Sequence, residues 1–123
     1  MIYDANNIFA RIIRGEAPAN KVFEDDEVLA FHNIAKAAPT HVLVIPKGDF
    51  VNFADFVKKT DADKVGNFFA KVAKVAAMLD LEGSGYRLIS NIGSDASQSV
   101  PHFHVHILGK KKLGALIVGD DSH

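Results

Sequence analysis

Apolar and polar positions follow two different periods along the chain, which predicts both helices and strands. Apolar residues spaced by three and four positions indicate a long helix over about 61–81, with Thr60 as its N-cap. The same spacing predicts a short helix that begins after Asn7 and ends at Gly15. Runs of β-branched and aromatic residues predict five strands, which are 21–24, 28–32, 41–45, 86–90 and 102–108. These elements predict an α+β fold with a five-stranded antiparallel sheet, one long helix and one short helix.

The apolar side of the predicted long helix allows two arrangements. It consists of residues at helical spacing, namely Val65, Phe68, Phe69, Val72, Val75, Ala76 and Leu79. Such a stripe can cover the sheet of its own chain, or it can pack against a second copy of the chain. The sequence leaves both arrangements open.

Composition excludes several classes of protein. The 123 residues are 48% hydrophobic, which is enough apolar material for one domain over 1–123. The formal net charge of −1 argues against broad binding to nucleic acid, which requires a basic face. The chain has no cysteine, so thiolate chemistry and cysteine–zinc sites are excluded. Because no apolar stretch reaches the ~20 residues of a membrane helix and the N-terminus lacks a signal-peptide pattern, we expect a cytoplasmic protein without membrane partners.

Three histidines are the most informative feature of the sequence. His102, His104 and His106 alternate with apolar residues in the last predicted strand. Side chains alternate between the two sides of a strand, so we expect all three imidazoles on one side. Burying three imidazoles side by side is costly unless each ring nitrogen has a partner. The pattern therefore indicates a functional site.

Two kinds of chemistry fit such a site. Alternate strand histidines bind zinc when a third ligand, such as His41, joins them from a neighbouring strand. The other interpretation is phosphate chemistry, because a neutral imidazole is a good nucleophile near pH 7. In that case the Ser/Gly-rich loop 93–99 would hold phosphate oxygens with its backbone amides.

The histidine segment resembles the signature of a known family. A His-x-His-x-His strand followed by two apolar residues and Gly109, and preceded by Gln98-Ser99-Val100, is similar to the signature of the histidine-triad (HIT) superfamily. Four further segments look like the Hint branch of this superfamily, namely residues 8–13, 23–26, 29–32 and 38–47. The resemblance implies a HIT-like fold, a homodimer and a reaction without a metal or other cofactor.

The resemblance also implies roles for individual residues. His104 would attack the α-phosphorus of a purine nucleoside 5′-phosphoramidate and release AMP or GMP through a nucleotidyl-histidine intermediate. His102 and His106 would contact phosphate oxygens, with His106 as proton donor nearer the leaving group. His41 would orient the triad. The remaining phosphate contacts would come from Ser99 and Gln98, and Asn91 would contact the phosphate or the sugar.

A nucleoside pocket follows from the same resemblance. It would be formed by Phe9, Ile12, Phe31, His32, Ile34 and Leu43. Where the family usually has an aspartate that binds both ribose hydroxyls, this chain has Asn33, so ribose binding is expected to differ. Two other functions remain open: hydrolysis of dinucleoside polyphosphates, and a nucleotide- or zinc-binding module whose catalysis is incidental.

Overall fold

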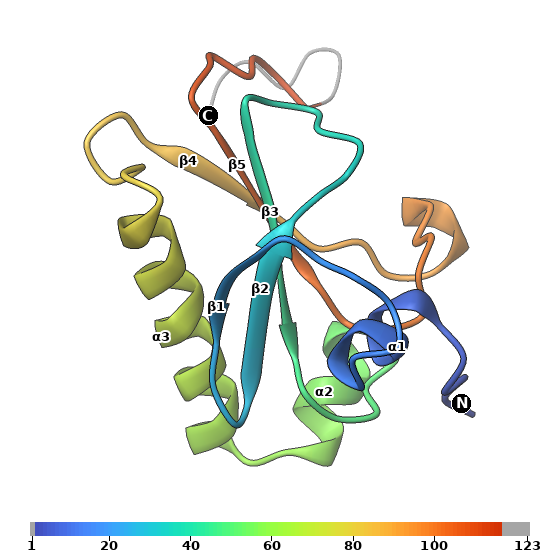
Figure 1. Cartoon of the computed structure of the whole chain (residues 1–123). Coiled ribbons are helices and arrows are strands. Elements are labelled where there is room, and N and C mark those ends of the chain that lie inside the picture. Colours follow the sequence, from blue (N-terminus) through green and yellow to red (C-terminus); the bar gives the residue numbers. More distant parts are fainter. Residues whose placement is uncertain (1, 117–123) are drawn as a thin grey trace.

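A five-stranded antiparallel sheet forms the centre of the protein (Figure 1). The computed structural model describes residues 2–116. The strands are β1 (Lys21–Glu24), β2 (Val28–His32), β3 (Thr40–Pro46), β4 (Tyr86–Ile89) and β5 (Val105–Gly109). Their order across the sheet is β1-β2-β3-β5-β4, and every neighbouring pair is antiparallel. The predicted α+β class and sheet are therefore confirmed.

Within residues 2–116, three α-helices accompany the sheet, one more than the sequence predicted, together with a short 3-10 helix at Ser94–Ala96. The α-helices are α1 (Ile8–Ile13), α2 (Phe53–Lys59) and α3 (Ala62–Met78). The long helix α3 runs along one side of the sheet, and α1 lies on the other side (Figure 1). The helix missed by the sequence analysis, α2, has a recognisable signal, because the Asn52 side chain caps it by accepting from the backbone N–H of Asp55 at 2.9 Å.

The predicted N-cap of the long helix was wrong by one residue. Asp61 is the N-cap, and its carboxylate accepts from the backbone N–H of Lys64 at 2.8 Å. Thr60 ends α2 instead, since its hydroxyl donates to the carbonyl of Phe56 at 2.7 Å. The error follows from the unrecognised α2, because Thr60 is the C-cap of that helix.

The two faces of the sheet carry two separate groups of buried residues. On the α3 side, Val42 and Val44 of β3 pack with Phe68, Val72 and other residues of the helix stripe. The stripe therefore covers the sheet of its own chain, which decides between the two arrangements left open above. On the opposite side, the core consists of Phe9, Ile12, Leu29, Phe31, Leu43 and Ile45. This second face is the one that holds the candidate site.

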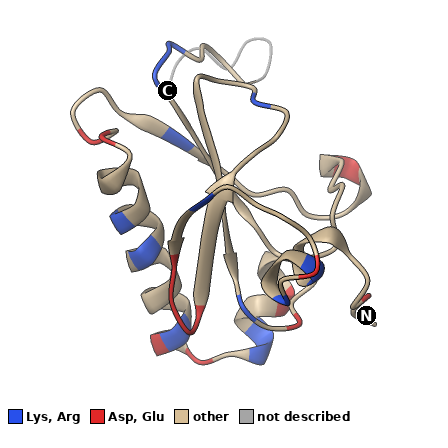
Figure 2. Cartoon of the chain, viewed as in Figure 1, with Lys and Arg blue, Asp and Glu red and all other residues tan. Residues whose placement is uncertain are grey.

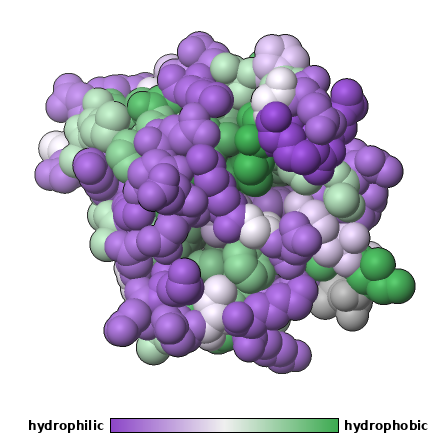
Figure 3. All heavy atoms as spheres, turned by 60° about the horizontal axis from the view of Figure 1, so that its bottom comes forward, coloured by the Kyte–Doolittle hydropathy of each residue, from purple (hydrophilic) through white to green (hydrophobic). Residues whose placement is uncertain are grey.

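Charged residues lie mainly on helix surfaces, turns and strand ends, and the central strand β3 carries none (Figure 2). The space-filling view shows mainly hydrophilic residues over one face, with apolar residues exposed between them in smaller patches (Figure 3). Within residues 2–116, no helix has the length and apolar character needed to cross a membrane.

The histidine segment departs from the predicted strand. The strand β5 begins at Val105, so His102, Phe103 and His104 precede it. The backbone N–H of Phe103 donates to the carbonyl of Phe50 at 2.8 Å, in the segment between β3 and α2. The regular alternation of strand side chains therefore does not extend to His102, and the three histidines occupy different surroundings.

Candidate active site

An open cavity of about 730 Å³ lies on the sheet face opposite α3. Its lining residues are Ile8, Phe9, Ile12, Pro18, Ala19, Asn20, Phe31, His32, Asn33, Ile34, Lys36, Leu43, Ser99, Val100, His104 and His106. This volume is typical of small-molecule sites. The lining contains no Asp or Glu, and Lys36 is its one basic side chain other than histidine. The cavity therefore suits an anionic ligand with an apolar part.

His104 is the histidine whose free nitrogen lies at this cavity. Its Nδ1 is 2.7 Å from the backbone oxygen of His102. A carbonyl oxygen only accepts hydrogen bonds, so Nδ1 carries the proton and Nε2 keeps its lone pair. Within residues 2–116, Nε2 has no hydrogen-bond partner. The ring packs edge-on against Phe9, with centroids 5.0 Å apart. His104 is thus held in the tautomer that a nucleophile requires.

His106 is linked to His41 by a directed hydrogen-bond chain. The backbone N–H of Ala37 donates to His41 Nδ1 at 3.0 Å, so a neutral His41 carries its proton on Nε2. That Nε2 is 2.8 Å from His106 Nδ1 and donates to it. A neutral His106 therefore carries its proton on Nε2. Because His106 lines the cavity beside His104, with ring centroids 5.1 Å apart, this N–H is a candidate proton donor to a bound ligand.

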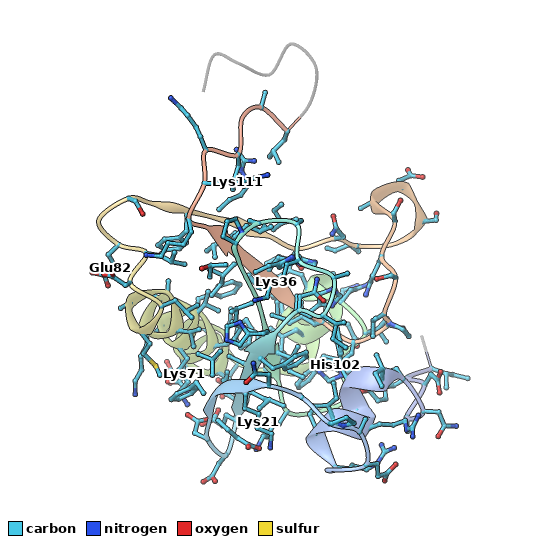
Figure 4. The ribbon with its side chains drawn as sticks, turned by 45° about the horizontal axis from the view of Figure 1, so that its top comes forward. Lys21, Lys36, Lys71, Glu82, His102 and Lys111 are labelled. Carbon is cyan, nitrogen blue, oxygen red and sulfur yellow. The ribbon has the colours of Figure 1, made fainter. Side chains whose placement is uncertain are left out.

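His102 has a different environment. It is fully buried, its Nε2 donates to the carbonyl of Pro46 at 2.8 Å, and its Nδ1 is 2.6 Å from the Tyr3 hydroxyl. Both ring nitrogens are therefore engaged by the protein, and the ring does not line the cavity. This geometry does not fit the expectation that His102 contacts phosphate oxygens. Figure 4 shows His102 between the sheet and the N-terminal segment.

Burial sets the charge state of the four histidines. It lowers the pKa of His102 to about 4. It also lowers the pKa of His106 to about 4, with smaller contributions from the neighbouring His104 and His41. The pKa values of His104 and His41 are lowered by burial as well. All four rings are therefore neutral at pH 7, as nucleophilic attack by His104 requires.

The loop before the histidines places one of its two predicted phosphate ligands at the cavity. Ser99 lines the cavity, and within the described chain its hydroxyl has no hydrogen-bond partner. Gln98 instead fastens the loop: its Nε2 donates to the carbonyls of Val51 and Val100, and its Oε1 accepts from the backbone N–H of Gly93. Because its polar atoms are used in this way, Gln98 supports the loop and is not free to bind phosphate.

The predicted nucleoside-binding residues are largely brought together. Phe9, Ile12, Phe31, His32, Asn33, Ile34 and Leu43 all line the cavity. Ile34 is fully exposed at the rim of the cavity. His32 Nδ1 is buried and has no hydrogen-bond partner within the described chain. Asn91 is not part of the lining, so the structure does not bring it to this site.

The zinc interpretation has no set of free ligands in this arrangement. Across residues 2–116, no group of three His, Cys, Asp or Glu side chains is placed to hold a metal ion. His41 and His106 are hydrogen-bonded to each other, and His102 is closed off by Pro46 and Tyr3. Phosphate chemistry remains the interpretation that fits the geometry.

Two partners of the histidines were not anticipated from the sequence. Tyr3 lies 99 positions before His102, and the backbone N–H of Ala37 sets the His41 tautomer. A backbone donor leaves no residue-type signal in a sequence. For Tyr3 no local pattern links the residue to the histidines, because the contact depends entirely on tertiary structure.

The fold and the histidines together define a protein that presents a neutral imidazole with a free ring nitrogen at an anion-compatible cavity. The model of the HIT domain matches residues 14–113, and the chain belongs to this family. It is 47% identical to a HIT-like protein of Azospirillum brasilense over 94% of both chains. A histidine triad protein from Clostridium difficile has the same fold, with a TM-score of 0.84 and 39% identity over 94% of this chain and all of that one. A HIT family hydrolase from Clostridium thermocellum also has this fold, with a TM-score of 0.80 and 39% sequence identity over 91% of this chain and 96% of that one.

Proposed function

We propose that this protein hydrolyses purine nucleoside 5′-phosphoramidates, and that His104 forms a covalent nucleotidyl intermediate. The observation that carries the proposal is the His104 tautomer. Its Nδ1–H is bound to the His102 carbonyl, and its Nε2 lone pair is left available at the cavity. The resemblance to the Hint branch supports the choice of a P–N bond as the bond that is cleaved.

In the first step, His104 Nε2 bonds to the α-phosphorus as the P–N bond of the substrate breaks. On substrate binding His106 takes up a proton, which the negative charge of the bound phosphate favours, and the leaving nitrogen takes a proton from this imidazolium, which returns to the neutral ring beside His41. In the second step, water attacks the phosphorus and returns a proton to His106, and the bond between phosphorus and His104 breaks. The products are a free amine and a nucleoside monophosphate, and both histidines regain their starting state.

The remaining parts of the cavity support substrate binding. Ser99 is a candidate donor to a phosphate oxygen. Phe9, Phe31 and Leu43 form apolar walls against which a purine can pack. The absence of carboxylates from the lining and the presence of Lys36 favour a substrate with negative charge.

The test is incubation of the purified protein with adenosine 5′-phosphoramidate, with and without a chelator, beside a His104→Asn variant. We expect AMP release that resists the chelator and falls by at least ~1,000-fold in the variant, because the covalent route is lost. Unchanged melting temperatures would show that the variant is folded. Release of AMP together with ADP or ATP from dinucleoside polyphosphates, but none from the phosphoramidate, would replace this proposal by the other hydrolase activity. No release from either class would favour a binding module.

We also propose that the protein forms a homodimer. Tyr86 and Leu88 of β4, at the edge of the described sheet, are 38% and 46% exposed, and Met78 at the end of α3 is 52% exposed. These apolar side chains would be covered by a second copy. Equilibrium sedimentation tests the proposal, and a monomer at micromolar concentration would contradict it.

A further inference from the structure

The buried end of the histidine segment is closed by the N-terminal segment of the chain. The Tyr3 hydroxyl lies 2.6 Å from His102 Nδ1, and the two rings meet edge-on with centroids 5.7 Å apart. Tyr3 lies outside the residues 14–113 that match the family model. The match therefore assigns no role to this contact.

The direction of the Tyr3 hydrogen bond follows from the second nitrogen of His102. Nε2 faces the carbonyl of Pro46 at 2.8 Å and must donate, so the neutral ring has its lone pair on Nδ1. Nδ1 then accepts the hydroxyl proton of Tyr3. The ring is fully buried, so no solvent replaces either partner. An unsatisfied ring nitrogen at this position would carry the cost of a buried polar group.

The N-terminal segment holds Tyr3 firmly in this position. The Asn7 side chain donates to the carbonyl of Asp4 at 2.7 Å and accepts from the backbone N–H of Ala10 at 2.9 Å, which ties the turn after Tyr3 to the start of α1. Phe9, in the first turn of α1, packs edge-on against both His102 and His104. Tyr3 is thus part of the same packed unit as the two histidines.

The contact reaches the nucleophile through one backbone atom. The carbonyl of His102 is the acceptor that keeps the proton of His104 on Nδ1. The peptide that carries this carbonyl is held by the bond from the Phe103 N–H to Phe50 and by the anchored His102 ring. If the ring loses an anchor, the backbone at His102 is freer to shift, and a displaced carbonyl would allow His104 to adopt the other tautomer, whose Nε2 is protonated and cannot attack.

We propose that Tyr3 is a positioning residue for His104: its hydroxyl holds the His102 ring in the orientation in which Pro46 sets the tautomer, and the His102 carbonyl in turn fixes the tautomer of His104. The effect on catalysis rests on the proposed function, whereas the effect on the two rings does not. Both are tested with Tyr3→Phe. Tyr86→Phe is the matched control, because Tyr86 is the only other tyrosine, it pairs with Gly109 on β5, and the substitution keeps the apolar ring that the proposed dimer would cover.

Ring-nitrogen NMR of ¹⁵N-histidine protein reads the tautomers directly. We expect the wild type and Tyr86→Phe to show His102 protonated on Nε2 and His104 on Nδ1. In Tyr3→Phe, the His102 Nδ1 resonance should shift because its donor is gone, and His104 should show a mixture of tautomers. With adenosine 5′-phosphoramidate, kcat should fall ~5- to 30-fold, which corresponds to the loss of about 1–2 kcal/mol. KM should stay within about twofold, since Tyr3 does not line the cavity.

The outcomes separate this proposal from the proposed function. Wild-type histidine resonances in Tyr3→Phe would overturn the positioning role, whatever happens to the rate. A lower melting temperature and a higher KM with unchanged tautomers would assign Tyr3 a structural role only and would also overturn it. If the wild type released no AMP, the phosphoramidase proposal would fail, and the NMR comparison would still decide whether Tyr3 positions His102 and maintains the His104 tautomer.

Discussion

His102 and His106 stand at equal distances from His104 in the sequence, but they have opposite environments in the structure. His102, with Tyr3 and Pro46, forms a closed end, where the ring is fully buried and both nitrogens are bound by the protein. His106, with His41, forms an open end, where one nitrogen is bound and the ring lines the cavity.

The difference shows that equal spacing does not give equal roles. At the closed end, the hydrogen bonds leave no proton free to move, so His102 serves to hold the backbone atom on which His104 depends. At the open end, the chain from Ala37 through His41 leaves one N–H of His106 at the cavity. We therefore propose that the closed end sets geometry and that the open end moves a proton. The predictions below test this division.

The largest effect is expected at the open end. His106→Gln removes the proton donor and should lower kcat for adenosine 5′-phosphoramidate by ~100-fold or more, the usual contribution of general acid catalysis. The loss should shrink for substrates whose leaving group needs no proton, such as a nitrophenyl ester of AMP. Steady-state kinetics with both substrates measure the difference. An equal loss on both would contradict the proton-donor role of His106.

His41→Asn serves as the companion variant for that experiment. It removes the donor that fixes the His106 tautomer and leaves the His106 ring in place. We expect a smaller loss, about tenfold, with the same dependence on the leaving group. An equal loss of kcat for both leaving groups would indicate that His41 acts on binding and not on proton transfer.

Stability against acid should be sensitive to both ends. The folded-state pKa values of His102 and His106 are lowered to about 4, below the unfolded value near 6.5, so the unfolded chain binds more protons between these pH values. The free energy of unfolding should therefore be insensitive to these groups above pH 6.5 and decrease as the pH falls toward 4. The slope from each histidine is at most about 1.4 kcal/mol per pH unit.

Urea unfolding at several pH values between 4 and 7 measures this slope, and His106→Gln provides the control. In the variant, the dependence of the unfolding free energy on pH should be smaller by the contribution of one histidine, and the contribution of His102 should remain. If the stability of the wild type were flat down to pH 4.5, the neutral, buried state assigned to these rings would be wrong.

Much of the fold could be predicted because local patterns decide it. The individual strands, the α3 stripe and the Asn7 cap all follow from residues close in sequence, whereas the pairing of β3 with β5 joins residues more than 60 positions apart. The site could be predicted only in part. The sequence predicts Gln98 as a phosphate ligand, but its side chain is hydrogen-bonded to the backbone of Val51 and Gly93. The roles of His102 and His106 differ because of partners 56 to 99 positions away, which spacing within the segment does not encode.

The smallest expected effect concerns Asn33, at the rim near the open end. Its Nδ2 donates to the carbonyl of Ala35 at 3.2 Å and lies 3.4 Å from both ring nitrogens of His41. Asn33→Asp replaces this donor with a second acceptor oxygen and adds a carboxylate, which can accept from both ribose hydroxyls. The lost bond to Ala35 offsets part of the gain. We expect KM for adenosine 5′-phosphoramidate to fall by about two- to fivefold, or up to ~1 kcal/mol.

The 2′-deoxy substrate separates ribose binding from a general effect of the added charge. Its KM should change less in Asn33→Asp than that of the ribose substrate, since one of the two hydroxyls is missing. An unchanged or higher KM for the ribose substrate would show that Asn33 does not face the sugar. A rise in KM for both substrates would indicate that the carboxylate repels the phosphate across a cavity whose described lining otherwise carries no negative side chain. Because His41 lies within 3.4 Å of this position, a change in kcat alone would place the effect of Asn33 on the proton-donating end of the site.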